Sequence, residues 1–494
     1  MSQATNRPQF IEKRHAGILL HPTSLPGGHG NGDMGPEAFN FVDFLQSCGA
    51  SVWQLLPLGP THDGGSPYMG LSVLAGNPQL ISLQLLVEWE WLREKELNAN
   101  DKLASLQLAA SHFHQRANAA AQQEYSDFLK QHESWLPDFA LFQAIRQHQH
   151  GRSWLDWPAP LRDKQAQAIA DTKKQLRTEI EHICFQQFVF FKQWLSLKQY
   201  ANERGILLFG DMPIFVALDS AEVWAHREYF DLAPDGHPKT VAGVPPDYFS
   251  KTGQRWGNPH YNWQRMRQDD FLWWRNRIGG SLELFDLIRI DHFRGFEAYW
   301  QIDADAKTAV KGKWIKAPGK ALFSALLKYF GELPFVAEDL GTITPEVDEL
   351  REKFGWPGMK ILQFAFDGNI HNPYLPHNHI PDSVVYTGTH DNDTTLSWFN
   401  ALNEHDKKGI YEYLGNTTEP MPWALIRCAL ASTANLAVVP MQDILSLGVG
   451  HRMNTPGVRD GNWSWRFQWS QVDGDVAGRF RHLVKMYGRE IEVD

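Results

Sequence analysis

Charged side chains stand at or just after the ends of several short apolar runs in this 494-residue sequence. When such runs are the strands of a parallel barrel, their C-terminal ends form one face, and the residues there meet in one pocket. A single acidic residue in this position is as readily the N-cap of the following helix, but that does not explain the whole set. The set comprises Asp211, Arg289, Asp291, Glu338, Asp367, Asp391 and Asp443.

Arg289 and Asp291 are two residues apart on one predicted strand, so their side chains point to the same face. We expect the guanidinium to hold the Asp291 carboxylate ionised, which makes it a candidate nucleophile. Glu338 or Asp391, from other strands, could then act as general acid and base. Two such carboxyl groups are what double displacement at a glycosidic carbon requires, so the pattern favours sugar chemistry.

Aromatic residues in Gly- and Pro-rich loops support the same interpretation. Most of the 20 tryptophans and 13 tyrosines of a chain this size are expected in the core. Tyr68 and Trp256, however, lie in segments with the composition of functional loops. Their flat rings could stack on the apolar faces of pyranose rings.

Composition excludes several other functions. The formal net charge is −10 and no run of five or more Lys and Arg occurs, which argues against a nucleic-acid partner. No stretch of about 18 apolar residues predicts a membrane span, and we expect a cytoplasmic protein. Three cysteines and no His-Glu-x-x-His or Cys-x-x-Cys motif predict neither a disulfide framework nor a metal site, and no cofactor is expected.

Two motif-like glycine clusters do not fit their usual functions. Residues 30–35 match G-x-G-x-x-G, but the glycines come about ten residues after the predicted strand, and the next strand ends without an acidic residue for a ribose. Residues 64–68 lack the final glycine of a serine-hydrolase elbow. We therefore expect neither a dinucleotide site nor a serine nucleophile.

Eight short apolar runs alternate with helix-like segments, which is typical of βα units. One such helix has apolar residues at Ala38, Phe41, Val42 and Leu45, and another at Phe188, Phe191 and Leu195. Eight units favour a closed (β/α)₈ TIM barrel over an open doubly wound sheet. The predicted strands are Ala16–Leu20, Ser51–Leu56, Ile206–Phe209, Phe285–Ile290, Phe335–Ala337, Met359–Phe364, Val384–Thr387 and Leu436–Met441.

Two long gaps interrupt this alternation within what we expect to be one catalytic barrel over residues 1–494. Residues 85–198, between strands 2 and 3, are rich in Ala, Gln, Glu, Lys and Leu and predict a mostly helical inserted subdomain. Residues 213–280, after strand 3, are dense in Gly and Pro and predict irregular loops on the active-site face.

Taken together, the motifs resemble those of the amylomaltases, also called 4-α-glucanotransferases or disproportionating enzymes, which form glycoside hydrolase family 77 within the α-amylase superfamily. The resemblance covers nearly the whole chain. The matching stretches are residues 21–27 (HPTSLPG), 66–68 (SPY), 75–78 (AGNP), 211–216 (DMPIFV), 243–250 (GVPPDYFS), 289–295 (RIDHFRG), 337–341 (AEDLG) and 389–394 (THDNDT).

This resemblance implies a role for each matching residue. Asp291 would be the nucleophile, Glu338 the acid and base, and Asp391 the residue that holds the distorted sugar in the transition state. The other residues implied to bind substrate are Tyr68, Asp211, Asp247, Trp256, Arg289, His292, Asp367, His390 and Asn462. The loop at 243–250 would lie over the cleft and help exclude water.

The implied reaction moves a segment of an α-1,4-glucan donor to the 4-hydroxyl of glucose or a maltooligosaccharide, with retention through a covalent glucosyl-enzyme. An α-amylase-like hydrolase would use the same carboxylates, and water exclusion alone separates the two. A sugar-binding barrel without catalysis would be expected to have lost one carboxylate, and all three are present. The sequence does not indicate an oligomeric state.

Overall fold

Eight parallel strands form the centre of the molecule. The computed structural model describes residues 13–27, 30–98, 101–246, 250–458 and 460–490. The strand order is β10-β11-β12-β1-β2-β3-β6-β9, and each neighbouring pair is parallel. The strands are β1 (His15–Leu19), β2 (Val52–Gln54), β3 (Leu207–Pro213), β6 (Leu287–Asp291), β9 (Phe335–Ala337), β10 (Gly358–Ile361), β11 (Ser383–Tyr386) and β12 (Leu436–Pro440).

The two outer strands of this order come together and nearly close the barrel. The N–H of Ala337 on β9 donates to the main-chain oxygen of Pro357, just before β10, at 2.9 Å. All eight predicted strands are present, which confirms the (β/α)₈ barrel. The strand residues are almost all buried, as expected where helices cover the outside and side chains fill the inside.

β3 and β6 end later than predicted, and β2 ends earlier. β3 extends to Pro213 and β6 to Asp291, so Asp211 and Asp291 lie within the last residues of their strands. β2 ends at Gln54, two residues before the predicted end, and Pro57 follows soon after. The carboxylates at these ends therefore share one rigid frame.

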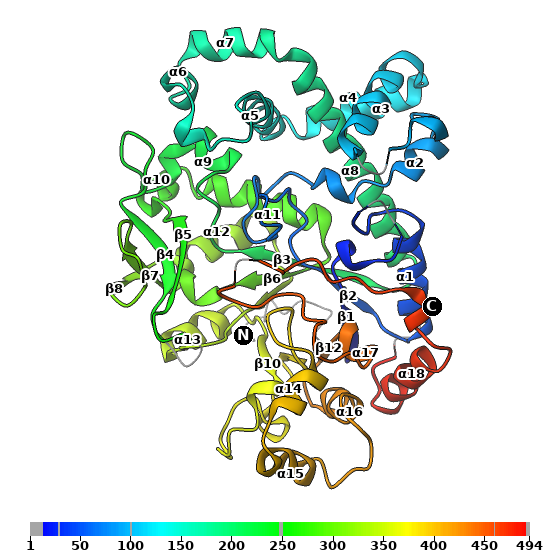
Figure 1. The fold of residues 1–494 in the computed structure, drawn as a ribbon. Helices are drawn as coiled ribbons and strands as arrows, with labels where there is room; N and C mark the ends of the chain where they lie inside the picture. The colour runs from blue at the N-terminus through cyan, green and yellow to red at the C-terminus, as the bar shows by residue number, and fades with distance from the viewer. Residues whose placement is uncertain (1–12, 28–29, 99–100, 247–249, 459, 491–494) are drawn as a thin grey trace.

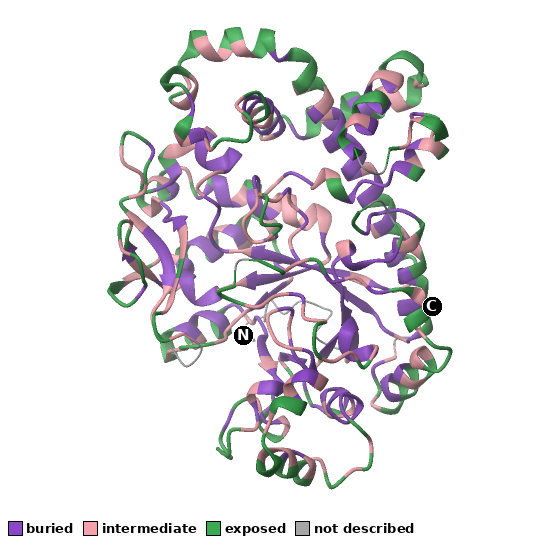
Figure 2. Ribbon diagram, viewed as in Figure 1, coloured by how far each residue is buried: buried purple, intermediate pink, exposed green. Residues whose placement is uncertain are grey.

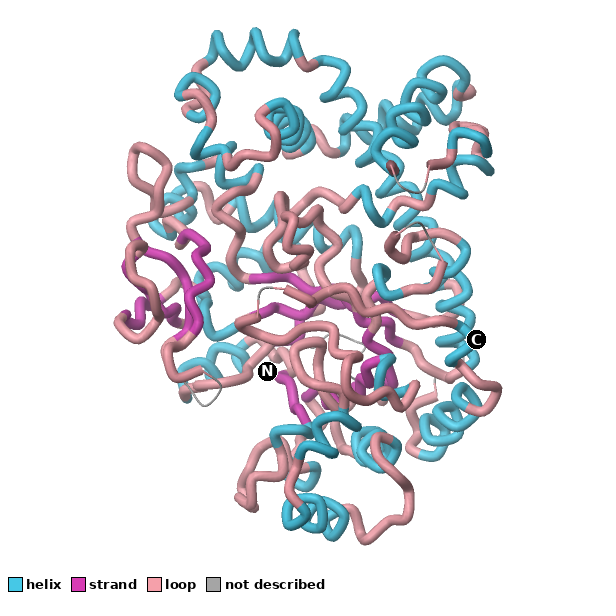
Figure 3. Tube along the Cα trace, in the orientation of Figure 1, coloured by secondary structure: helices cyan, strands magenta, loops and turns pink. Residues whose placement is uncertain are grey.

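Helices surround the strands, and loops cross in front of the strand ends (Figures 1 and 3). The buried residues concentrate in the central strands, whereas α7 and α15 at the periphery are mostly exposed (Figure 2). The helices are α1 (Pro36–Ser47), α2 (Leu83–Glu88), α3 (Lys102–Arg116), α4 (Ala119–Gln131), α5 (Leu136–His148), α6 (Ala159–Arg162), α7 (Ala166–Gln175), α8 (Arg177–Asn202), α9 (Ala221–Ala225), α10 (Trp263–Gln268), α11 (Leu272–Leu284), α12 (Gly319–Phe330), α13 (Pro345–Lys353), α14 (Thr395–Ala401), α15 (Glu404–Tyr413), α16 (Trp423–Ala431), α17 (Met441–Ile444) and α18 (Val476–Met486).

The two helical patterns differ in how well they predict burial. The predicted apolar stripe of α1 is fully buried. On α8, Phe188 and Phe191 are buried but Leu195 is 37% exposed, and Trp194 takes the inner position instead. The predicted helix is present, but it is long and packs against both α5 and β3, so its buried face is not a single regular stripe.

The segment 213–280 is more regular than the loops we expected. It contains α9, α10, α11 and two strands, β4 (Thr240–Val244) and β5 (Gln254–Pro259), which join β7 (Ala298–Asp303) and β8 (Gly312–Lys316) in an antiparallel sheet of order β5-β4-β7-β8. Its glycines serve close strand pairing: a Cβ on Gly243 would lie 2.2 Å from the main-chain oxygen of Gln254. Gly/Pro density thus marked a bulged hairpin here.

The segment 85–198 contains helices throughout its described residues, and Figure 1 shows it as a layer beside the barrel. At the opposite end of the strands, the buried guanidinium of Arg489 donates to the main-chain oxygens of His15 at 2.9 Å and Asn435 at 3.2 Å. These oxygens lie at the N-terminal ends of β1 and β12. Arg489 therefore fastens the C-terminal segment to the strand ends farthest from the carboxylates.

Candidate active site

Arg289 joins two of the predicted carboxylates. β3 and β6 pair so that Asp211 lies opposite Arg289. Nη1 of Arg289 donates to both oxygens of Asp211 at 2.8 and 2.7 Å, and Nη2 donates to Oδ1 of Asp291 at 2.9 Å. Asp211 and Arg289 are buried, whereas the Asp291 side chain keeps 28% of its exposure. Asp211 and Arg289 therefore lie at the buried base of the site, and Asp291 lies on its solvent-exposed side.

Tyr68 connects this network to His390, which lies in the loop after β11. Its hydroxyl donates to Oδ2 of Asp211 at 2.6 Å and lies 2.8 Å from Nε2 of His390. Because its only proton goes to Asp211, this hydroxyl accepts from a His390 that carries its proton on Nε2. Burial lowers the pKa of His390, which keeps the ring neutral. The two rings also stack, with centroids 5.3 Å apart.

Asp391 completes this chain of contacts. Its Oδ1 lies 3.4 Å from Nε2 of His390 and accepts a hydrogen bond of 2.6 Å from Nδ2 of Asn454. The side chain is 46% exposed and so stays open to the cleft. Tyr68, Asp211, Arg289, Asp291, His390 and Asp391 are thus connected in one polar network.

Glu338 follows β9 and is tied to His292, the residue after Asp291. Its Oε2 accepts the backbone N–H of His292 at 2.7 Å, and its Oε1 accepts that of Leu340 at 2.9 Å. Burial, with the nearby charge of Asp291, raises the pKa of Glu338 to about 8 against the opposing effect of Arg289. At neutral pH this carboxyl holds a proton that it can give away.

Asp291 behaves differently from Glu338, although burial raises its pKa too, to about 6. Arg289 opposes that rise through its charge and its hydrogen bond, and the exposed edge of the carboxylate also favours ionisation. Burial outweighs the arginine, so the pKa lies above its ordinary value although Arg289 limits the rise. At pH 7 Asp291 is nevertheless ionised while Glu338 is protonated.

His292 lies beside Glu338 and packs against Trp256. His292 has the left-handed backbone angle φ 50°, and this turn aims its N–H at Glu338. Its ring is perpendicular to that of Trp256, with centroids 4.8 Å apart. Burial lowers the pKa of His292 to about 3, so it is a neutral ring at the edge of the site.

Two predicted substrate-binding residues of the described part of the chain, Asp367 and Asn462, make side-chain hydrogen bonds within their own loops. Asp367 is exposed and closes a turn by accepting the N–H of Asn369. Asn462 accepts the N–H of Thr455 and donates to the main-chain oxygen of Val458, so it shapes its own loop. Asp247 lies outside the described residues.

Sequence reasoning missed Asn454 and Trp463, both in the segment that follows β12. Asn454 contacts Asp391, and the Trp463 ring lies 5.9 Å from that of Tyr68 and 6.1 Å from that of His390. Trp463 has φ 64°, which is uncommon for a bulky residue and typical of functional sites. The one available indication was composition, because residues 451–463 are dense in Gly, Pro and Asn.

Asp443, also predicted from its strand end, lies beneath this region. It is buried and accepts hydrogen bonds from the hydroxyls of Thr387 and Thr395, both at 2.6 Å, and from the N–H of Thr395 at 2.8 Å. These contacts hold both ends of the loop that carries His390 and Asp391. Asp443 is therefore a support for the site.

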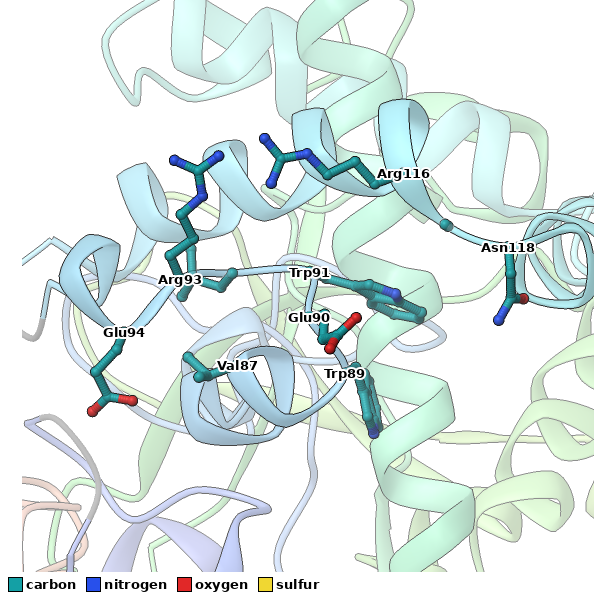
Figure 4. A pocket seen from close by; sticks show the side chains of 10 residues that line it. Val87, Trp89, Glu90, Trp91, Arg93, Glu94, Arg116 and Asn118 are labelled. Atoms are coloured by element: carbon teal, nitrogen blue, oxygen red, sulfur yellow. The ribbon is translucent and has the colours of Figure 1, made fainter.

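A hollow of about 510 Å³ lies elsewhere, between α2 and the C-terminal end of α3 (Figure 4). Trp89, Trp91, Arg93 and Arg116 are among its walls, and Trp91 packs on the ring of Phe113. It contains only the carboxylates of Glu90 and Glu94, both exposed, and no buried acid. The paired carboxylates at the strand ends remain the candidate catalytic group.

Two further kinds of feature, a metal-binding cluster and a membrane-spanning helix, are absent from the described part of the chain. Within it, no group of three or more His, Cys, Asp or Glu residues is arranged to hold a metal ion. Among the same residues, no helix is both long enough and apolar enough to span a membrane.

Comparisons with known proteins identify the family of the chain. A family model described as 4-alpha-glucanotransferase matches residues 20–471. The chain is 47% identical to a 4-alpha-glucanotransferase of Thermus thermophilus, covering 96% of this chain and 98% of that one, and 46% identical to one of Synechocystis, covering 98% and 99%. The structure of an amylomaltase from Streptococcus agalactiae in complex with acarbose superposes with a TM-score of 0.93 at 37% identity, covering 97% and 100%.

These matches over the whole barrel define an enzyme that transfers glycosyl groups. The chain belongs to the 4-α-glucanotransferases of glycoside hydrolase family 77.

Proposed function

We propose that the enzyme transfers segments of α-1,4-glucan with retention, through a covalent glucosyl-enzyme on Asp291. The observation that carries this proposal is the placement of two carboxyl groups: Asp291 accepts from Arg289, and Glu338 accepts the backbone N–H of His292, the residue after Asp291. Asp291 is ionised beside Arg289, whereas Glu338 is protonated at neutral pH. Nucleophile and acid are the two roles that a retaining mechanism assigns to such a pair.

In the first step an oxygen of Asp291 attacks the anomeric carbon of the donor. Arg289 donates to Oδ1, which leaves Oδ2 as the attacking atom. The bond from the anomeric carbon to the glycosidic oxygen breaks, and that oxygen takes the proton of Glu338. The products are a β-glucosyl ester on Asp291, a released glucan end and an ionised Glu338.

In the second step the 4-hydroxyl of glucose or a maltooligosaccharide attacks the same carbon. Glu338 takes the proton of that hydroxyl, and the Asp291 carboxylate leaves. Two inversions restore an α-1,4 bond. Asp391, with His390 and Tyr68, would hold the hydroxyls of the distorted sugar more tightly in the transition state than in the ground state.

Transfer in place of hydrolysis requires that an acceptor sugar reach the intermediate before water does. The backbone N–H of His292 contacts Glu338, and the His292 ring packs against Trp256. Glu338 gives a proton to the leaving oxygen and takes one from the entering hydroxyl. An aromatic surface there would favour a sugar ring over water. The cytoplasmic location stays a prediction from the sequence.

Incubation of the purified protein with maltotriose alone, without added metal or cofactor, tests this function. We expect glucose together with oligosaccharides longer than the substrate, separated by chromatography. Glucose and maltose with nothing longer would establish a hydrolase instead.

A further inference from the structure

The segment after β12 reaches back to the loop after β11 and contacts its catalytic part at three points. Nδ2 of Asn454 donates to Oδ1 of Asp391 at 2.6 Å. Nη2 of Arg452 donates to the main-chain oxygen of Asp391 at 2.7 Å, and the N–H of Asn454 donates to that of His390 at 3.1 Å. Both the backbone and the carboxylate of Asp391 are thus held by this segment.

The segment itself is fixed next to Asn454. Nε of Arg452 donates to the main-chain oxygen of Asn454 at 3.0 Å, and the N–H of Trp463 donates to that of Met453 at 2.8 Å. The Trp463 ring in turn packs beside His390. The amide of Asn454 is therefore presented from a braced turn.

The chemistry of this contact is specific to an amide. Within the described residues, Nδ2 of Asn454 and Nε2 of His390 both lie against Oδ1 of the carboxylate. Oδ2 therefore remains for a hydroxyl of the substrate, on a side chain that is 46% exposed. A neutral amide fixes the rotation of the carboxylate and leaves its negative charge intact. A lysine or arginine in that place would neutralise the charge.

We propose that Asn454 is a positioning residue that locks the Asp391 carboxylate with Oδ1 filled and Oδ2 aimed at the sugar. This inference rests on the proposed role of Asp391 in the transition state. Asn454 lies outside the sequence motifs, yet under this proposal it orients Asp391, one of the three carboxylates.

The first test is a double-mutant cycle with Asn454→Ala and Asp391→Asn, followed by kinetics on maltotriose. Asn454→Ala is expected to lower kcat about 10- to 100-fold, the effect of one hydrogen bond to a charged group, with KM changed less than about threefold. Placed in the Asp391→Asn background, it should cost almost nothing further, because both changes remove the same function. Equal losses in both backgrounds would overturn the proposal.

The second test keeps the shape of the side chain, in case the alanine variant is poorly folded. Asn454→Asp places a second carboxylate against Asp391 and should raise the pKa of the pair, so the acidic limb of kcat moves to higher pH by about one unit or more. Asn416→Asp, an exposed site at the end of α15, is the matched control and should leave the profile unchanged. An unmoved limb in Asn454→Asp would overturn the proposal.

The two proposals fail in different ways. If Asp391→Asn alone keeps nearly full activity, the role of Asp391 is wrong and that of Asn454 falls with it. If Asp391→Asn is inactive but Asn454→Ala changes only KM or melting temperature, the mechanism stands and Asn454 is merely structural.

Discussion

Glu338 accepts a 2.7 Å hydrogen bond from the backbone N–H of His292, the residue directly after Asp291. Glu338 and Asp291 therefore come from the ends of different strands but are joined through a single main-chain step. A shift of either strand end would change both positions at once. Because this contact uses the backbone, substitution of the His292 side chain would not remove it.

Asp291→Asn should abolish transfer while the fold is retained. The amide cannot form the glucosyl ester, and we expect a loss of kcat of at least about 10³-fold. Maltotriose disproportionation and circular dichroism are the measurements. Asp270→Asn makes the same change at an exposed position and serves as the control. Activity near that of the control in the Asp291 variant would exclude Asp291 as nucleophile.

The pH dependence of kcat/KM should be bell-shaped. Asp291 must be ionised, so activity is lost as pH falls through about 6, and Glu338 must be protonated, so activity is lost as pH rises through about 8. α-Glucosyl fluoride needs no proton on its leaving group. In Glu338→Gln, formation of the glucosyl adduct from this donor, followed by mass spectrometry, should therefore lose the alkaline limb only. A persistent alkaline limb would assign it to another group.

The raised pKa of Glu338 also predicts a pH-dependent stability. The pKa is about 8 in the folded protein against an ordinary 4.5, so the folded state binds more protons across this window and loses stability as pH rises through it. Glu338→Gln has no proton to lose. The melting temperature of the variant minus that of the wild type should be higher at pH 9 than at pH 5 by about 2 °C or more. A difference that is constant with pH would contradict the shift.

Trp256→Ala should increase hydrolysis at the expense of transfer. Without the indole beside His292, water would compete better for the glucosyl-enzyme, and we expect the share of hydrolysis to rise several-fold. The measurement is new reducing ends per glucose released from maltotriose. Trp89→Ala, in the hollow of the helical segment, is the control. Equal shares in both variants would remove Trp256 from the acceptor side.

The sequence predicted the barrel strands and their charged residues better than the loops that lie against them. Each barrel strand is a short apolar run, and Arg289 and Asp291 share a face because strand residues alternate with period two. Their pairing with Asp211 depends on the register between β3 and β6, which no local pattern contains. β7 and β8 were not predicted because their residues do not alternate regularly between buried and exposed.

Asn454 and Trp463 were missed for a related reason. Neither carries a charge, and both lie in an irregular segment whose path is set by tertiary contacts alone. Conversely, the predicted roles of Asp367 and Asn462 came from resemblance, and the structure shows these side chains closing local turns. Their contact with substrate stays a prediction.

The hydrogen bonds of Arg489 to His15 and Asn435 also bear on how the enzyme could be immobilised. They fasten residues close to both ends of the described chain to the barrel face opposite the carboxylates. A bead, a surface or a partner enzyme attached close to His15 or Arg489 would therefore lie on the side of the barrel away from the carboxylates. Anchored in this way, the catalyst would present its cleft outward to soluble starch without any redesign of the cleft.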